Sequence, residues 1–201
     1  MGRLAILISG RGSNLQALID AIERGILDAE IAVVISDRPD ILGLARAEKA
    51  GIRTRVLPWQ GDEHRESYFE AMAQVLHDEK IDLIVLAGFM RVLSRNIIRE
   101  FPNKIINIHP SLLPAFSGMR AQRQALKYGV KLAGCTVHFV DEGVDTGPIL
   151  IQRAVPVYSH DTEDTLAQRI LAEEHVALPE AVQMVLAGNW RIQGRRVICE
   201  H

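Results

Sequence analysis

One short stretch decides how the chain is organised, namely Ile105-Ile106-Asn107-Ile108-His109-Pro110-Ser111-Leu112-Leu113-Pro114. Its first five residues are mostly β-branched and end at a proline, which predicts a buried strand whose carboxyl end opens into a loop. Because alternate side chains of a strand share a face, Asn107 and His109 are expected to point the same way. In open α/β sheets ligands bind at this edge, where a carboxamide and an imidazole can stabilise an oxyanion and move a proton. A capping Asn beside a half-buried structural His explains this stretch alone equally well.

The composition is that of an ordinary globular protein. Of the 201 residues, 48% are hydrophobic and 24% are charged, which is enough for one substantial core, so a single domain over 1–201 is expected. The formal charge is -2 and the basic residues are scattered, which argues against nucleic acid or an anionic membrane as a partner. The 2 cysteines lie far apart and predict neither a disulfide framework nor a thiolate metal site. No apolar segment approaches the roughly 20 residues that span a bilayer, and free thiols suit the cytosol, so we expect a cytoplasmic protein.

Apolar runs that predict strands alternate with helical patterns along most of the chain. The predicted strands are 4–8, 31–35, 53–57, 81–87 and 105–109. Two further strands, 132–140 and 149–155, follow each other without a helix and predict an antiparallel hairpin. A long helix over 162–186 should be interrupted or bent near Pro179, and a small hairpin should end the chain. The pattern predicts an α/β fold, a Rossmann-like doubly wound and mostly parallel sheet with an antiparallel C-terminal strand addition.

The loop after the first strand is rich in glycine, reading Gly10-Arg11-Gly12-Ser13-Asn14. It opens a helix, where backbone N–H groups and the helix dipole favour an anion, most often phosphate. The dinucleotide fingerprint needs a third glycine where this chain has Leu15, so a single phosphate is the better interpretation. Asp37, at the end of the second strand, only partly mimics the ribose-binding acid of that fingerprint. The competing interpretation is a glycine turn with Ser13 as the helix N-cap.

A carboxylate, Asp145, follows the predicted strand at 132–140. It lies in a loop bracketed by glycines. If this strand neighbours the one at 105–109, Asp145 reaches the same sheet edge as His109 and can favour its protonated form. An Asp that merely forms a turn is the simpler interpretation. His138 can point into the site or into the core, and the core edge is slightly favoured. The histidines have no metal-ligand spacing, and no serine has the glycine frame of a nucleophile elbow.

Four motifs follow one another along the chain. They are Gly10-x-Gly12-Ser13-Asn14, Leu86-Ala87-Gly88-Phe89-Met90-Arg91-Val92-Leu93, Asn107-Ile108-His109-Pro110-Ser111-Leu112-Leu113-Pro114, and Gly134-Cys135-Thr136-Val137-His138-Phe139-Val140 with Asp145-x-Gly147-Pro148. Together they closely resemble the folate-dependent formyltransferase family, and the resemblance covers nearly the whole chain. It implies transfer of a formyl group from 10-formyltetrahydrofolate to the amine of glycinamide ribonucleotide in purine synthesis, without a metal.

The resemblance also implies roles for individual residues. Asn107, His109 and Asp145 match the family's catalytic trio, in which the Asn and a protonated His stabilise the oxyanion and the Asp orients and charges the His. Glu174 matches a residue that contacts the ribonucleotide. The residues that match its phosphate site are Gly12, Ser13 and Asn14. The residues that match the folate pocket are Met90, Arg91, Val92, Leu93, Val140, Asp141, Glu142 and Val144.

The loop after Pro114 departs from the family pattern. The chain reads Phe116-Ser117-Gly118-Met119-Arg120, whereas the family usually shows an aromatic residue followed by Pro-Gly-Leu-His. Ser117 would loosen a loop that proline stiffens. Arg120 replaces a histidine expected near the phosphate and Glu174, so it is expected to pair with either.

Two other functions stay open at this point. One is hydrolysis of 10-formyltetrahydrofolate, with water in place of the amine, although the phosphate loop favours a phosphorylated acceptor. The other is a non-catalytic module that binds a nucleotide or folate, since a fold does not fix a function. The retained trio argues against such a module. Small-molecule substrates are the expected partners, and the chain could be a monomer or a homodimer.

Overall fold

The computed structural model describes residues 1–200 and divides into two compact units. The first unit is Met1–Ile106, and the second begins at Asn107. Strand β5 (Ile105–His109) crosses the boundary along the chain, and each unit is described here by itself. The expected single domain over the whole chain stays a prediction.

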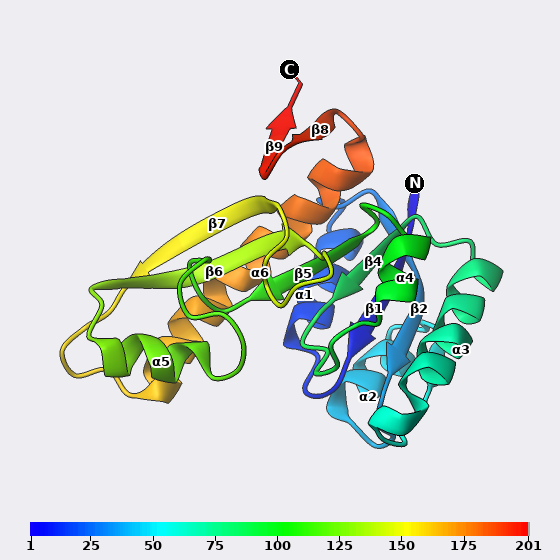
Figure 1. The fold of residues 1–201 in the computed structure, drawn as a ribbon, viewed down its shortest axis with the longest axis horizontal. Helices are drawn as coiled ribbons and strands as arrows, with labels where there is room; N and C mark the ends of the chain where they lie inside the picture. The colour runs from blue at the N-terminus through cyan, green and yellow to red at the C-terminus, as the bar shows by residue number, and fades with distance from the viewer. Residues whose placement is uncertain (201) are drawn as a thin grey trace. The chain divides into compact units, whose positions relative to one another are not determined.

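The first unit alternates strands with helices, as its apolar pattern predicts (Figure 1). Its elements are β1 (Gly2–Ile8), α1 (Ser13–Glu23), β2 (Ala29–Ser36), α2 (Leu42–Lys49), β3 (Thr54–Val56), a 3-10 helix (Asp62–His64), α3 (Arg65–Asp78), β4 (Leu83–Leu86) and α4 (Arg95–Glu100). The strands lie in the order β3-β2-β1-β4, and all three pairings are parallel. The five residues from Leu4 to Ile8 have no exposed surface, which explains why β1 reads as a continuous apolar run.

The path of the chain through this sheet makes it doubly wound. From β1 the chain steps outward to β2 and β3, and then returns past β1 to β4. Because crossovers between parallel strands are right-handed, this reversal places α3 on the face opposite α1 and α2. The helix contacts agree, since α1 packs against α2 and α3 packs against α4. The reversal leaves the carboxyl ends of β1 and β4 next to each other.

The second unit is built mainly of antiparallel strands. After β5 come α5 (Ala121–Tyr128), β6 (Leu132–Phe139), β7 (Ile149–Pro156), α6 (Glu163–Ala187), β8 (Trp190–Gln193) and β9 (Arg196–Cys199). β6 pairs antiparallel with β7, β8 pairs antiparallel with β9, and β7 meets β9 at one parallel pair. Helix α6 lies against β6 and β7. The predicted α/β class, with a mostly parallel sheet and antiparallel C-terminal strands, is therefore confirmed.

Some predicted boundaries need adjustment. The expected interruption near Pro179 is not found, because α6 runs as one helix from Glu163 to Ala187 with Pro179 inside it, and the alternative of a bend stays a prediction. The helix starts at a capping box in which Thr162 accepts a hydrogen bond from the Thr165 N–H.

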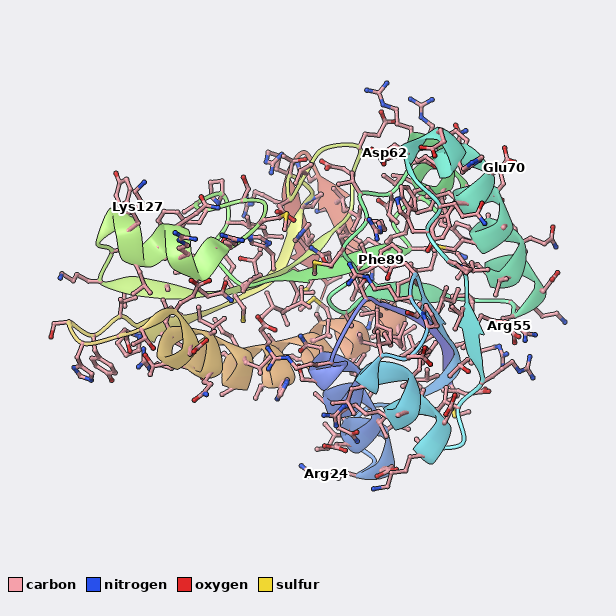
Figure 2. All side chains as sticks on the ribbon, turned by 90° about the horizontal axis from the view of Figure 1, so that it is seen from below. Arg24, Arg55, Asp62, Glu70, Phe89 and Lys127 are labelled. Carbon is pink, nitrogen blue, oxygen red and sulfur yellow. The ribbon has the colours of Figure 1, made fainter. Side chains whose placement is uncertain are left out.

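None of the helices in residues 1–200 is both long enough and apolar enough to cross a membrane. Figure 2 shows Arg24, Glu70 and Lys127 pointing outward, and all three side chains are exposed.

Candidate active site

Three side chains of the second unit converge on one another at the carboxyl end of β5. Asn107 and His109 point from the same face of the strand, as the alternation predicts, and both contact Asp145. The carboxamide nitrogen of Asn107 lies 3.5 Å from Asp145 Oδ1, and His109 Nδ1 lies 3.3 Å from Asp145 Oδ2. The sequence places these residues up to 38 positions apart, and the β6–β7 connection brings them together.

The ring of His109 is held at both nitrogens. Nε2 lies 2.9 Å from the carbonyl oxygen of Phe116, and since a carbonyl can only accept, Nε2 carries a hydrogen and donates it. A neutral ring would then direct the lone pair of Nδ1 at the Asp145 carboxylate. A doubly protonated ring instead donates to both oxygens, so this geometry suits an imidazolium.

A fourth polar side chain belongs to the cluster, although the sequence slightly favoured a position at the core edge for it. His138 is buried, with its Nε2 3.2 Å from the Asn107 carboxamide nitrogen and 3.7 Å from Asp145 Oδ1. Its Nδ1 lies 2.8 Å from the carbonyl oxygen of Phe139. The alternation of β6 is a signal that could have found it. Val137 and Phe139 point to one face of the strand and His138 to the other, and β6 is the neighbour of β5. His138 therefore fixes the position of Asn107.

The carboxylate of Asp145 is the centre of the cluster. Besides its contact with His109, Oδ2 accepts a hydrogen bond from the Gly118 N–H at 2.8 Å. Burial raises the pKa of Asp145. The hydrogen bonds from His138 and the Gly118 N–H, together with the charge of His109, lower it by more than burial raises it, so the pKa of Asp145 is below its ordinary value. Its backbone is left-handed, with φ 55°, which Asp tolerates better than most residues. The cluster thus holds a stable negative charge beside the imidazole.

The loop from Ser111 to Arg120 supplies the carbonyl and the N–H that hold this cluster. Its start is anchored by the buried Thr136 hydroxyl, which donates to the Ser111 carbonyl at 2.7 Å and accepts from the Leu113 N–H at 3.0 Å. Its end is the first turn of α5, where Arg120 has φ 58° and an exposed side chain. Glu174, on α6, is buried. The pairing of Arg120 with Glu174 stays a prediction.

The glycine loop of the first unit has the backbone that an anion site needs. Gly12 is the N-cap of α1 with φ 69°, and the first hydrogen bond of the helix runs from the Gln16 N–H to its carbonyl. A side chain here is impossible without rearrangement, since a Cβ on Gly12 would lie 2.6 Å from the Cα of Gly43 in α2. The competing interpretation of Ser13 as the N-cap is therefore wrong. Ser13 and Asn14 instead lie in the first turn of the helix, where backbone N–H groups point toward the helix N-terminus.

The loop after β4 is fastened at several points of its backbone. The Met90 N–H donates to the Ser9 hydroxyl at 2.9 Å, and the Arg65 guanidinium donates to the carbonyls of Val92 and Leu93 at 2.6 and 3.0 Å. Met90 and Val92 are exposed, whereas Leu93 is buried. An apolar surface is thereby displayed on a fixed loop.

The other residues expected to bind folate, in the segment 140–144 of the second unit, lie between β6 and β7. Asp141 Oδ1 accepts hydrogen bonds from the Gly143 N–H at 3.1 Å and from the Thr146 hydroxyl at 2.6 Å. The side chain of Asp141 thus shapes its own loop. Val144 is exposed, and Val140 and Glu142 complete the segment.

Comparisons with known proteins show the family of the chain. A formyl transferase family model matches residues 2–182. The chain is 51% identical over 189 residues to the trifunctional purine biosynthetic protein adenosine-3 of Drosophila melanogaster. The match covers 93% of this chain but only 14% of the length of that protein. It is 40% identical over 191 residues to phosphoribosylglycinamide formyltransferase of Bacillus subtilis, with 95% of this chain and 98% of the relative covered. The crystal structure of glycinamide ribonucleotide transformylase 1 from Symbiobacterium toebii is similar at a TM-score of 0.96 and 49% identity, covering 100% of this chain and 95% of that one. The chain belongs to the formyl transferase family.

Proposed function

We propose that this chain transfers the formyl group of 10-formyltetrahydrofolate to the amine of glycinamide ribonucleotide, a step of purine biosynthesis. The observation that carries the proposal is the convergence of Asn107, His109 and Asp145 at the end of β5. The names of the relatives support the choice of acceptor, because the Bacillus subtilis protein, which this chain matches over nearly its full length, is a phosphoribosylglycinamide formyltransferase.

In the proposed reaction the amine attacks the formyl carbon directly, and the formyl oxygen becomes an oxyanion. The Asn107 carboxamide donates a hydrogen bond to this charge, and the protonated His109 ring, whose N–H groups meet Phe116 and Asp145, stabilises it through its positive charge. The contact between Asn107 and Asp145 is weak at 3.5 Å, so that hydrogen can turn to the oxyanion at little cost. The shorter contact with His138, at 3.2 Å, then keeps the carboxamide in place.

Asp145 has two tasks in this scheme. Its negative charge favours the imidazolium of His109, which must be charged before the oxyanion forms. It can also accept the proton that the attacking amine loses, directly or through a water molecule. When the tetrahedral intermediate collapses, the bond between the formyl carbon and N10 of the folate breaks, and tetrahydrofolate leaves with that proton on N10. A carboxyl whose pKa lies below its ordinary value stays ionised for both tasks at neutral pH.

We place the two substrates on the remaining predicted residues. The backbone at Gly12, Ser13 and Asn14 is assigned to the phosphate of the ribonucleotide. Glu174 and Arg120 keep the role that the resemblance implies for them, recognition of the ribonucleotide. The residues that we assign to the folate are Met90, Arg91, Val92 and Leu93 in the first unit and Val140, Asp141, Glu142 and Val144 in the second. No metal takes part in the scheme. A cytoplasmic location, small molecules as the only partners, and a monomer or homodimer complete the proposal.

The test is a steady-state absorbance assay of folate product formation from 10-formyltetrahydrofolate, with and without glycinamide ribonucleotide. Wild type, His109→Ala and a matched control, His160→Ala, are compared. His160 belongs to the same unit but stacks on Tyr158 in an exposed loop, so its loss should leave turnover unchanged. We expect turnover that requires the acceptor and that collapses only in His109→Ala.

Each alternative has its own outcome in this assay. Equal turnover without the acceptor would identify a hydrolase. Binding of both ligands without any turnover would identify a binding module. A His109→Ala variant as active as the control would remove the imidazole from the mechanism.

A further inference from the structure

A buried carboxylate of the first unit has no part in the chemistry above. Asp37 directly follows β2, and its side chain has 0% exposure. Its Oδ2 accepts a hydrogen bond from Nε of Arg91 at 2.8 Å, and a second arginine, Arg38, lies 3.9 Å away. An enclosed carboxylate needs such a cation, because burying it unpaired is very costly. Since Asp37 is enclosed and bonded to Arg91, it is not presented to a ribose.

The guanidinium of Arg91 is fixed on a second side by an aromatic ring. Its central carbon lies 5.0 Å from the ring centroid of Trp59, within cation–π range. Trp59 is itself wedged edge-on against Tyr68, and its backbone N–H donates to the Asp37 carbonyl at 3.2 Å. One carboxylate oxygen and one ring therefore fix both the direction and the plane of the guanidinium. With Nε occupied, the two terminal nitrogens form the edge that can meet an anion, and the side chain is 26% exposed.

This arrangement carries a cost in stability. Among residues 1–200, the hydroxyl of Tyr68 and the second oxygen of Asp37 are buried without a hydrogen-bond partner. Burial and the charge of Asp37 both raise the pKa of Tyr68, so its hydroxyl stays neutral. Buried polar atoms are nearly always paired in folded proteins, and exceptions call for a functional reason. The position of Arg91 offers such a reason.

We infer that Asp37 is a positioning residue for the folate co-substrate, holding the Arg91 guanidinium so that its terminal N–H groups meet a carboxylate of that ligand. The inference rests on the proposed function, because it assigns Arg91 to the folate. Arginine suits this role, since its planar fork matches a carboxylate when its orientation is fixed. The phosphate of the ribonucleotide is the other anion in the reaction, and the experiment separates the two.

The test compares Asp37→Ala with Asp37→Asn. The alanine removes the acceptor for Arg91 Nε, whereas the asparagine keeps an acceptor oxygen and loses only the charge. We expect Asp37→Ala to raise KM for 10-formyltetrahydrofolate by about tenfold, the effect of losing one orienting hydrogen bond, with kcat and KM for the ribonucleotide nearly unchanged. Asp37→Asn should recover most of this loss. Asp62→Ala, an exposed aspartate of the same unit labelled in Figure 2, is the matched control.

A double mutant tests whether Asp37 acts through Arg91. In an Arg91→Ala background, Asp37→Ala should leave KM for the folate unchanged, because the group that Asp37 positions is gone. Additive effects of the two substitutions would overturn the inference. So would an Asp37→Ala variant that unfolds at lower urea but keeps both KM values, or one in which KM rises for the ribonucleotide.

A binding measurement separates this inference from the proposed function. Titration calorimetry with tetrahydrofolate needs no turnover and can be run on every variant. If wild type shows no acceptor-dependent turnover, the proposed function fails, but weaker tetrahydrofolate binding in Asp37→Ala still supports the positioning role. Equal affinity of wild type and Asp37→Ala overturns it.

Discussion

Replacing Asp145 with asparagine is the sharpest perturbation of the proposed mechanism. Asparagine has the same shape, and it tolerates the left-handed backbone that Asp145 adopts at φ 55°. The Gly118 N–H can still donate to the amide oxygen in place of Oδ2. What the variant loses is the negative charge 3.3 Å from His109 Nδ1. The substitution therefore tests charge with little change of structure.

The expected size of the effect follows from that contact. A hydrogen bond between charged groups is worth about 1.5 to 3 kcal/mol, more than a neutral one. The Asp145–His109 contact strengthens as His109 stabilises the oxyanion, so most of this energy should appear in the barrier. At about 1.4 kcal/mol for each factor of ten, kcat should fall by about 10- to 150-fold. Losing Asp145 as proton acceptor would add to this.

The assay is the same acceptor-dependent turnover, with both substrates saturating, run beside urea unfolding of each variant. Asp145→Asn should unfold near the wild-type midpoint while its kcat falls. The reasoning would be refuted by an Asp145→Asn protein with kcat within about twofold of wild type, a difference below 0.5 kcal/mol. A large loss of stability with unchanged kcat would make Asp145 structural.

Three further predictions concern the backbone and the pH response. Gly12→Ala forces a side chain into a left-handed position against the start of α2, so it should cost about 1 to 3 kcal/mol in urea unfolding and raise KM for the ribonucleotide. Thr136→Val keeps the shape of the side chain but removes the hydroxyl that pairs with the Ser111 carbonyl and the Leu113 N–H. The free energy of unfolding, measured in urea, should therefore fall by about 2 to 4 kcal/mol. The pKa of Asp145 is lower in the folded state, so its contribution to stability is present above the unfolded pKa of about 3.9 and is lost as pH falls through the folded value. Urea unfolding between pH 7 and 2 should show this loss in wild type, and an unchanged pH dependence in Asp145→Asn would contradict it.

The parts of the fold that follow from local pattern could be predicted. β1 reads as an apolar run because it is buried on both faces, and the alternation of β5 correctly puts Asn107 and His109 on one face. The absence of a helix between β6 and β7 correctly indicates their antiparallel pairing. In each case the signal lies within a few neighbouring residues.

The parts that depend on distant partners could not. Asp37 and Arg91 are separated by 54 positions, and nothing near either residue indicates that they meet. His138 reads as a core residue because its strand neighbours are apolar, and only the pairing of strands brings it to Asn107. Pro179 breaks helices by local propensity, yet α6 continues through it, since packing against β6 and β7 can outweigh one lost hydrogen bond.

Ser9 links the two loops of the first unit that we propose for ligands. Its hydroxyl accepts from the Met90 N–H and its own N–H donates to the Gly88 carbonyl at 3.1 Å, while the next residue begins the glycine loop. The loop proposed for phosphate and the loop proposed for folate therefore share one anchor. A ligand that shifted Ser9 from either side would alter the affinity of the other loop, and thermodynamic linkage requires that change to be equal in both directions. The strength of the coupling between the two substrates, whichever binds first, would then depend on this serine.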